Sequence, residues 1–234
     1  MFNFSSLVAT PSLNKNVNFD PRKDLAPISM LGRMSVSLSV NPALPVKTLR
    51  ELTDYALANP GKLNFASVGA LDTLLARMLM KDSGIAMTQV NYKGPVQSMQ
   101  DVMAGVIQIG INPIGAHIEL AKGGRVRMLT VFGAERDLGA PDVLTTTESG
   151  FPGVKFNGMW LGLFGPSKMR RDRLDLIATE VDKALKRADV REKLVARMLK
   201  PEGSSPEAMG AILSADLEQW GKFAMDNGLV QATK

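Results

Sequence analysis

Residues 62–94 read KLNFASVGALDTLLARMLMKDSGIAMTQVNYKG, and this stretch decides the fold. An apolar segment ends at Ser67, and a turn of small residues follows it. A helical apolar pattern then runs through residues 74–80 until Gly84 stops it. Residues 85–90 predict a second strand. The order strand, loop, helix, strand indicates one βαβ unit with parallel strands.

The loop of this unit carries small and polar residues where a strand gives way to a helix. Backbone N–H groups at a helix start favour an anion, so we interpret the loop as a ligand loop. Its candidate binding residues are Ser67, Gly69, Ala70 and Thr73. Asp72 has two interpretations that the sequence leaves open. Its ionised carboxylate would repel a bound anion, or it caps the helix and occupies the donors itself.

The rest of the chain extends this α/β pattern. Residues 35–40 alternate between serine and apolar residues and predict a strand with one apolar face. A strand at residues 106–111 precedes Asn112, which is a candidate ligand contact, although Asn-Pro is also an ordinary turn. Residues 4–9 predict a strand remnant whose polar candidates are Ser5 and Ser6. A strand over residues 159–164 and two helices are expected to finish the chain.

Composition excludes several classes of protein. The 234 residues include no cysteine, which removes disulfides, thiol nucleophiles and cysteine metal sites. The net charge of +5 comes from dispersed basic residues, with one cluster at residues 168–173 that we interpret as a solvated helix entrance. Aromatic residues are not interleaved with the basic ones, so nucleic acid is not an expected partner. The sequence contains no run of eighteen apolar residues, which is the length that would predict a membrane span.

Motifs for catalysis and cofactor binding are absent from the sequence. It contains neither a Gly-x-Ser-x-Gly nor a P-loop pattern. His117 is the single histidine and has no neighbouring pattern of metal ligands, so we interpret it as structural. We therefore predict no catalytic residue, no metal and no cofactor.

Several short motifs, in order along the chain, carry a family resemblance. They are DPRKDLAPIS at 20–29, NPALPVKT at 41–48, PGKLNFAS at 60–67, YKGP at 92–95, GRVR at 124–127, PDV at 141–143, ESGFPG at 148–153 and WLG at 160–162. Together they resemble the substrate-binding protein of tripartite tricarboxylate transporters, the Bug family. The resemblance covers essentially the whole chain.

The resemblance implies a two-lobed α/β fold of the type II periplasmic-binding-protein kind, with the ligand between the lobes. Lobe one would comprise residues 1–35 and 161–234, including the C-terminal helices, and lobe two would be a parallel α/β domain over residues 36–160. The implied function is capture of a small carboxylate, without catalysis, for membrane permease subunits. The implied location is the periplasm.

The sequence also departs from the family pattern. It has Leu74-Leu75 where the family has His-Leu, and its first residues show no signal peptide. The signal and first glycine-rich loops of the family are missing, which predicts an incomplete first lobe, weak or absent ligand binding, and self-association. The alternatives are a truncated non-binding remnant and a small α/β enzyme.

Overall fold

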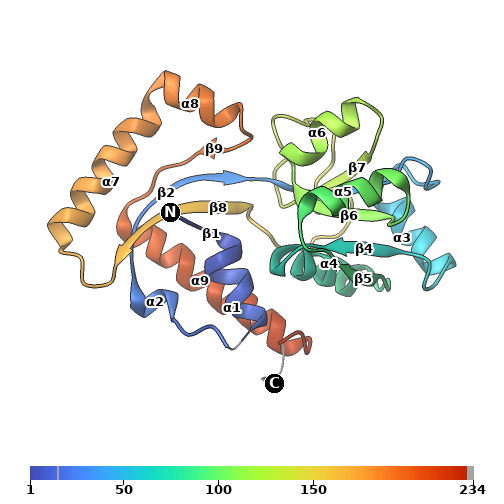
Figure 1. Cartoon of the computed structure of the whole chain (residues 1–234), viewed down its shortest axis with the longest axis horizontal. Coiled ribbons are helices and arrows are strands. Elements are labelled where there is room, and N and C mark those ends of the chain that lie inside the picture. Colours follow the sequence, from blue (N-terminus) through green and yellow to red (C-terminus); the bar gives the residue numbers. More distant parts are fainter. Residues whose placement is uncertain (15, 231–234) are drawn as a thin grey trace. The chain divides into compact units, whose positions relative to one another are not determined.

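The computed structural model describes residues 1–14 and 16–230, and its contacts divide the chain into two compact units. Unit 1 comprises Met1–Met34 and Met159–Lys234, and unit 2 comprises Ser35–Gly158. The sequence-based ranges place these boundaries at 35/36 and 160/161. Residues 231–234 of the predicted first lobe lie outside the described part. Figure 1 labels the elements of both units.

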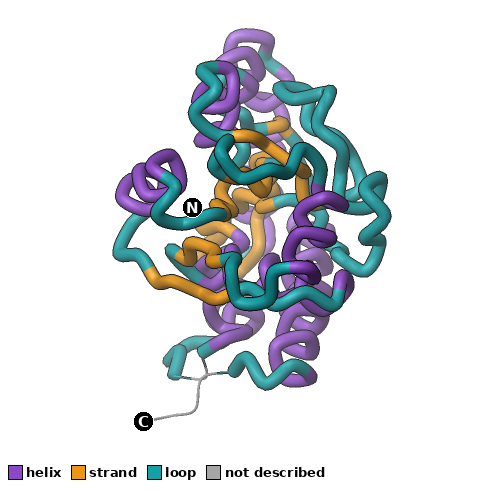
Figure 2. Tube along the Cα trace, turned by 90° about the vertical axis from the view of Figure 1, so that its right-hand side faces the viewer, coloured by secondary structure: helices purple, strands orange, loops and turns teal. Residues whose placement is uncertain are grey.

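Unit 2 is a five-stranded sheet with helices packed on it. Its elements are β3 (Val36–Val40), α3 (Leu49–Ala58), β4 (Asn64–Ser67), α4 (Ala70–Ser83), β5 (Thr88–Asn91), α5 (Pro95–Ala104), β6 (Ile109–Pro113), α6 (Gly115–Lys122) and β7 (Arg127–Phe132). The strand order is β5-β4-β6-β3-β7. Figure 2 shows helices on either side of the strands.

The βαβ unit predicted for residues 62–94 is confirmed. Strands β4 and β5 pair in parallel, with Asn64 opposite Thr88, and α4 packs on β4. Gly84 ends α4 in the left-handed conformation with φ +73°, which glycine adopts without a steric penalty. The apolar residues of α4 include Leu74, Leu75 and Leu79, and all three are fully buried. Burial of this helix face fixes the direction in which the chain returns to β5.

The predicted all-parallel sheet of lobe two is wrong in one respect, because β3 runs against its neighbours. It lies between β6 and β7 and pairs antiparallel with both. The strand itself is confirmed, but its serine face is as buried as its apolar face, and neither Ser37 nor Ser39 is exposed. An interior strand has both faces covered, so alternation in this segment does not mark a solvent side.

Unit 1 contains the remaining elements. They are β1 (Phe2–Asn3), η1 (Ser5–Ala9, a π-helical turn), α1 (Thr10–Leu13), α2 (Pro21–Asp24), β2 (Leu25–Met34), β8 (Met159–Pro166), α7 (Arg171–Lys186), α8 (Ala188–Val195), β9 (Lys200–Pro201) and α9 (Pro206–Asp226). The sheet order is β1-β8-β2-β9, and β8 pairs antiparallel with β1 and with β2.

The predicted strand remnant at residues 4–9 is wrong, because this segment is helical. Only Phe2–Asn3 forms a strand. Phe4, Leu7 and Val8 recur at helical spacing and are all buried. The ring of Phe4 lies edge-on to Trp220, with centroids 5.5 Å apart, and to Trp160 at 6.1 Å. Packing of this helical face against α9 and β8 therefore overrides the β-forming residues of the segment.

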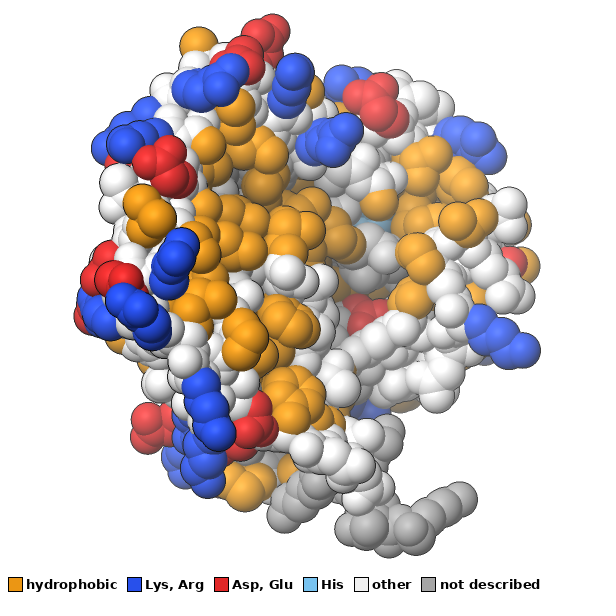
Figure 3. Space-filling view, turned by 60° about the vertical axis from the view of Figure 1, so that its left-hand side comes forward, with side chains coloured by type: hydrophobic (Ala, Val, Ile, Leu, Met, Phe, Trp, Pro, Cys, Tyr) orange, Lys and Arg blue, Asp and Glu red, His pale blue; other side chains and the backbone are white. Residues whose placement is uncertain are grey.

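In the described part of the chain after β8, residues 167–230, three helices form where two were predicted. A break at Arg187, whose backbone is extended, separates α7 from α8. Only Ala178 and Leu185 of α7 are buried, while Leu176 is 52% exposed. Figure 3 shows hydrophobic side chains gathered over a broad area on the side where α7 and α8 lie, with charged side chains along its border. Self-association of the chain stays a prediction.

Candidate functional site

The candidate site of unit 2 lies at one edge of its sheet. Strand β4 is parallel to β5 and β6, and β3 is antiparallel to both β6 and β7. The carboxyl ends of β4, β5, β6 and β7 therefore share an edge, where ligands bind in open α/β sheets. Ser67 ends β4, Gly69 is the N-cap of α4, and Ala70 and Thr73 lie in its first turn. The structure thus brings these four candidates together.

Asp72 caps α4 and uses the donors of the loop. Its carboxylate accepts hydrogen bonds from the backbone N–H of Val68 and, at 3.0 Å, from that of Gly69. Its side chain is buried, and this burial raises the pKa of Asp72 to about 6, against the lowering effect of the amide hydrogen bonds. Of the two interpretations of Asp72, the structure shows the capping one.

Hydroxyl groups of the loop bond to each other and to the loop backbone. The Oγ1 of Thr73 donates to the carbonyl oxygen of Gly69 at 3.0 Å and lies 2.7 Å from the Oγ of Ser67. The Nε2 of Gln89 contacts Thr73 Oγ1 at 3.2 Å and Asn91 Oδ1 at 2.8 Å. Sequence reasoning missed Gln89 and Asn91 as members of this network. Their place at the end of the next parallel strand is the signal that could have found them.

Asn112 lies inside unit 2, in β6, and not in the loop predicted for it. Its Nδ2 lies 3.4 Å from His117 Nε2 and 3.3 Å from the sulfur of Met99. The other ring nitrogen of His117 lies 2.8 Å from the Oγ of Ser37. Because β6 pairs with β3, β6 continues through Asn112 and Pro113. The Asn-Pro pair predicts a turn at this point, so the sequence does not reveal the continuation.

His117 is the centre of this polar chain and is fully buried. Burial lowers its pKa to about 4. The neutral ring accepts at Nε2 from the Asn112 amide and donates at Nδ1 to Ser37, which satisfies both nitrogens. The structural interpretation of His117 is thereby supported by its contacts: it anchors α6 to β3 and β6.

The candidate residues of unit 1 lie at the junction of β1 and η1. Ser6 and Asn3 bond reciprocally: Ser6 N–H donates to Asn3 Oδ1 at 2.9 Å, and Ser6 Oγ donates to the Asn3 carbonyl oxygen at 2.9 Å. The Oγ of Ser5 contacts the sulfur of Met159 at 3.8 Å. A neutral asparagine therefore caps this helix start, whereas the charged Asp72 caps the one in unit 2.

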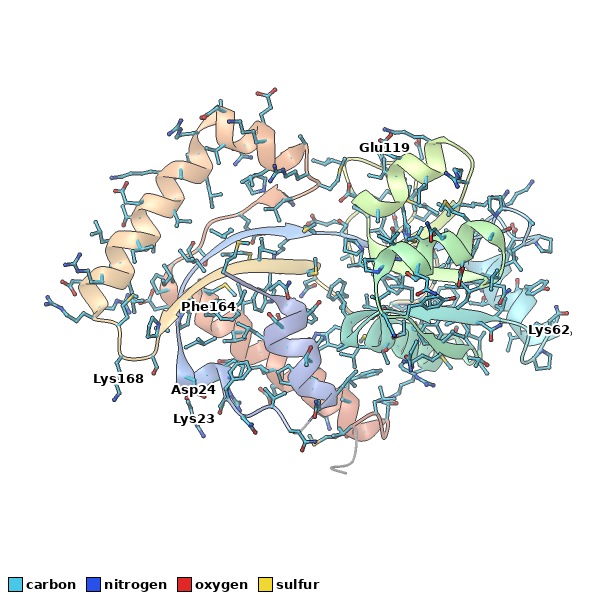
Figure 4. All side chains as sticks on the ribbon, viewed as in Figure 1. Lys23, Asp24, Lys62, Glu119, Phe164 and Lys168 are labelled. Atoms are coloured by element: carbon cyan, nitrogen blue, oxygen red, sulfur yellow. The ribbon has the colours of Figure 1, made fainter. Side chains whose placement is uncertain are left out.

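The basic cluster at residues 168–173 shows the features of a solvated helix entrance. Lys168 points away from the ribbon (Figure 4). Arg170 pairs with Asp172 at 2.8 Å, and Arg171 pairs with Asp175 at 2.9 Å and also with Glu207. Paired, exposed guanidinium groups leave little charge for an anionic partner.

Among residues 1–14 and 16–230, no group of three or more histidine and acidic side chains could hold a metal ion. Within the same residues, no helix is both long and apolar enough to cross a membrane.

Comparison with known proteins identifies the family. The model of the tripartite tricarboxylate transporter family receptor, TctC, matches residues 1–229. The chain belongs to this family. Protein BugT of Bordetella pertussis is 25% identical over 219 residues, which cover 93% of this chain and 67% of BugT. The chain therefore spans about two thirds of the length of this relative.

Solved structures of the TctC family share the fold. R. palustris Rpa4515, solved with adipate, superposes with a TM-score of 0.87 at 25% identity over 97% of this chain and 76% of that one. MatC from Rhodopseudomonas palustris, solved with bound malate, gives a TM-score of 0.80 at 23% identity over 94% of this chain and 76% of that one. The predicted α/β fold of periplasmic-binding-protein type is confirmed, with an antiparallel sheet in unit 1 and a mixed sheet in unit 2.

Proposed function

We propose that this TctC chain is a solute-binding protein that captures a small carboxylate and delivers it to the permease subunits of a tripartite tricarboxylate-type transporter. The observation that carries the proposal is the family match over residues 1–229, joined to a fold match over 97% of this chain with a relative solved with adipate. The role is binding without catalysis. We propose the periplasm as its location, in line with the similar fold of the periplasmic binding protein BugD.

The proposed ligand contacts lie where helices begin after strands. In unit 2 they are Ser67, Gly69, Ala70 and Thr73, with Asn112 on the neighbouring strand β6. In unit 1 they are Ser5 and Ser6. Hydrogen bonds to a charged group contribute roughly 1.5–3 kcal/mol each, and micromolar binding needs about 8 kcal/mol. A handful of such contacts is therefore sufficient for a transport receptor.

Isothermal titration calorimetry with a panel of small mono- and dicarboxylates tests the proposal. In line with the weak binding that the sequence predicts, we expect at least one carboxylate to bind with a dissociation constant above about 1 μM and below about 1 mM. Uncharged analogues such as diols should give no heat. If no carboxylate raises the melting temperature or releases heat at millimolar concentration, the proposed function is wrong for this chain.

Loop variants give a second, residue-level prediction. Replacing Ser67 by alanine, or Thr73 by valine, removes the hydrogen bond between their hydroxyl groups, whose oxygen atoms lie 2.7 Å apart in the loop. Losing one uncharged hydrogen bond costs about 0.5–1.5 kcal/mol, so we expect the affinity for the carboxylate to fall about threefold to tenfold. Ser83→Ala is the matched control, because its hydroxyl bonds to Leu79 at the other end of α4. Equal losses in all three variants would point to the stability of α4 and not to the loop.

A further inference from the structure

A hollow of about 470 Å³ lies on unit 2, at the edge of the sheet opposite the 67–73 loop. Its walls are residues 41–43, the last turns of α5, and the turn at residues 124–125 between α6 and β7. Strand β3 ends at this edge, and β6 and β7, which run antiparallel to β3, begin there. The hollow is therefore separate from the candidate contacts, and its volume is in the range of small-molecule sites.

Asn41 holds the first two walls together. Its Nδ2 donates to the carbonyl oxygens of Val102 and Met103, at 2.9 Å each, and its Oδ1 accepts from the backbone N–H of Ala43 at 2.8 Å. The bonds from Nδ2 satisfy carbonyl groups that the end of α5 leaves without a partner in the helix. They also fix residues 41–43 against α5, and a preformed site loses less conformational entropy on binding.

The third wall presents Arg125. After α6 the chain makes a Schellman-type turn, in which Gly124 has a φ of +67° and the N–H of Arg125 donates to the carbonyl oxygen of Leu120 at 2.8 Å. The N–H of Gly124 donates to the carbonyl oxygen of Ala121 at 2.9 Å. These bonds fix the backbone of Arg125 at the hollow, while the residue itself is exposed and open to a ligand.

Two side-chain donors of the hollow are unused. Within residues 1–14 and 16–230, the side chains of Arg125 and Gln100 make no hydrogen bond or ion pair. Gln100 lies on α5 and Arg125 follows α6, so the two donors come from different walls. A guanidinium group holds its N–H donors in a planar fork that matches the two oxygens of a carboxylate.

The charges around the hollow favour an anion. None of the described residues that line it is acidic. The single acidic side chains of α5 and α6, Asp101 and Glu119, already have a hydroxyl and an ammonium partner at 2.8 Å each. Arg127 adds a second positive charge next to Arg125, because its Nη1 donates to backbone carbonyl groups of residues 42–46. These two charges outweigh the ends of α5 and α6, which carry about half a negative charge each.

Part of the lining is apolar. Pro42, Ala43 and Met103 contribute to it, and Met103 packs on the buried cluster that contains Val102 and Ile107. A ligand that places hydrocarbon on these side chains removes apolar surface from water. An anion with a short hydrocarbon part therefore fits the hollow better than phosphate, which has none.

We propose that this hollow is a binding site for a small monocarboxylate. The carboxylate pairs with the guanidinium fork of Arg125 and accepts a further hydrogen bond from Gln100. The hydrocarbon part of the ligand lies on Met103, Pro42 and Ala43. The site goes beyond the proposed function and does not depend on it, because it shares no residue with the proposed ligand contacts.

A titration of the isotope-labelled full chain with pentanoate, followed in amide proton–nitrogen NMR spectra, tests the proposal. Pentanoate should shift the amide signals of Gln100, Ala104 and Gly124 with a dissociation constant of about 1 mM or below. Pentan-1-ol has the carbon chain without the charge, and phosphate has charge without the carbon chain. Each should bind at these residues at least about tenfold more weakly than pentanoate.

Variants separate the charge of Arg125 from the shape of the hollow. Arg125→Gln removes the charge and should weaken pentanoate binding about tenfold or more, whereas Arg125→Lys keeps the charge without the fork and should weaken it about threefold. Ala104→Phe keeps Arg125 and fills part of the hollow, so it should weaken binding as well. Arg191→Gln is the matched control, because Arg191 is exposed on α8 of unit 1, and it should leave the affinity unchanged. Thermal unfolding of each variant identifies loss of fold.

Several results would overturn the proposal. They are the absence of shifts at these signals with pentanoate at about 10 mM, an affinity for pentan-1-ol or phosphate equal to that for pentanoate, and an affinity that Arg125→Gln leaves unchanged. The calorimetric test of the proposed function is repeated in Arg125→Gln, so that heat from the hollow is not counted as binding at the transport site. Carboxylate binding that persists in this variant supports the proposed function whether or not the hollow binds pentanoate.

Discussion

Replacing Trp220 by alanine is expected to destabilise unit 1 by about 3–5 kcal/mol, the usual cost of truncating a fully buried aromatic side chain. Trp220 is 1% exposed and lies on α9. Its ring contacts that of Phe4 edge-on, with centroids 5.5 Å apart, and lies 6.3 Å from that of Phe223. The substitution would leave a cavity between α9 and the N-terminal helical segment. Neighbouring side chains cannot fill this cavity unless the backbone moves.

Denaturant unfolding followed by tryptophan fluorescence measures this effect. Both tryptophans lie in unit 1, so the remaining Trp160 reports on that unit alone. Trp220→Phe keeps most of the buried area and should lose less than Trp220→Ala. Met225→Ala is the control on the same helix, because Met225 is 60% exposed and its truncation should cost less than about 0.5 kcal/mol. A loss in Trp220→Ala no larger than in this control would mean that the segment at residues 4–9 does not pack on α9.

The βαβ unit at residues 62–94 was predictable because its signals are local. Small residues mark the loop, the apolar spacing marks α4, and Gly84 supplies the left-handed residue that ends it. The family motifs extended this prediction over the whole chain. The irregular connection expected from residue 133 to residue 158 is present as well, since no helix or strand forms there.

The errors arise where distant segments decide the structure. Strand β2 went unpredicted because Pro27 and Gly32 interrupt its pattern, and its pairing with β8 is irregular near both residues. The direction of β3 appears in its antiparallel pairing with β6 and β7, which its own alternating residues do not reveal. The segment at residues 4–9 contains the β-forming residues Phe4 and Val8, and its helical form follows from its packing against α9 and β8.

The state of the candidate loop could not be read from the sequence either. Asp72 fits an N-terminal helical turn in both interpretations, and residue order does not reveal whether its carboxylate turns back to Val68 and Gly69. Asn112 presents the same difficulty, because an Asn-Pro pair reads as a turn while the structure buries it in β6. At Asp72 and at Asn112, the direction of the side chain decides between the two interpretations, and the identity of the residue does not.

Acidification is expected to destabilise unit 2 through His117. The pKa of this fully buried histidine is lowered from 6.5 to about 4 in the folded state, so protonation favours the unfolded chain. The stability that the neutral ring contributes is complete above pH 6.5 and is lost as the pH falls towards the folded pKa near 4. The expected loss is about 2 kcal/mol at pH 5 and approaches about 3 kcal/mol near pH 4.

A variant that cannot titrate isolates this contribution. The free energy of unfolding of the unaltered chain and of His117→Gln should be compared by circular dichroism at pH 7 and at pH 5. At pH 7 the variant should be the less stable, because the bonds from the ring to Ser37 and Asn112 are altered. Its disadvantage should shrink by about 2 kcal/mol at pH 5, where only the unaltered chain must bury a ring that prefers to be protonated.

The comparison between the two chains also removes the opposing effect of Asp72. The pKa of that carboxyl is raised from 3.8 to about 6, so its favourable contribution is present at low pH and lost as the pH rises through 6. This contribution is common to both chains and cancels in their difference. A difference in stability that stays constant from pH 7 to pH 5 would mean that the His117 ring reaches water or a carboxylate in the folded protein, and that it does not hold α6 against β3 as a neutral group.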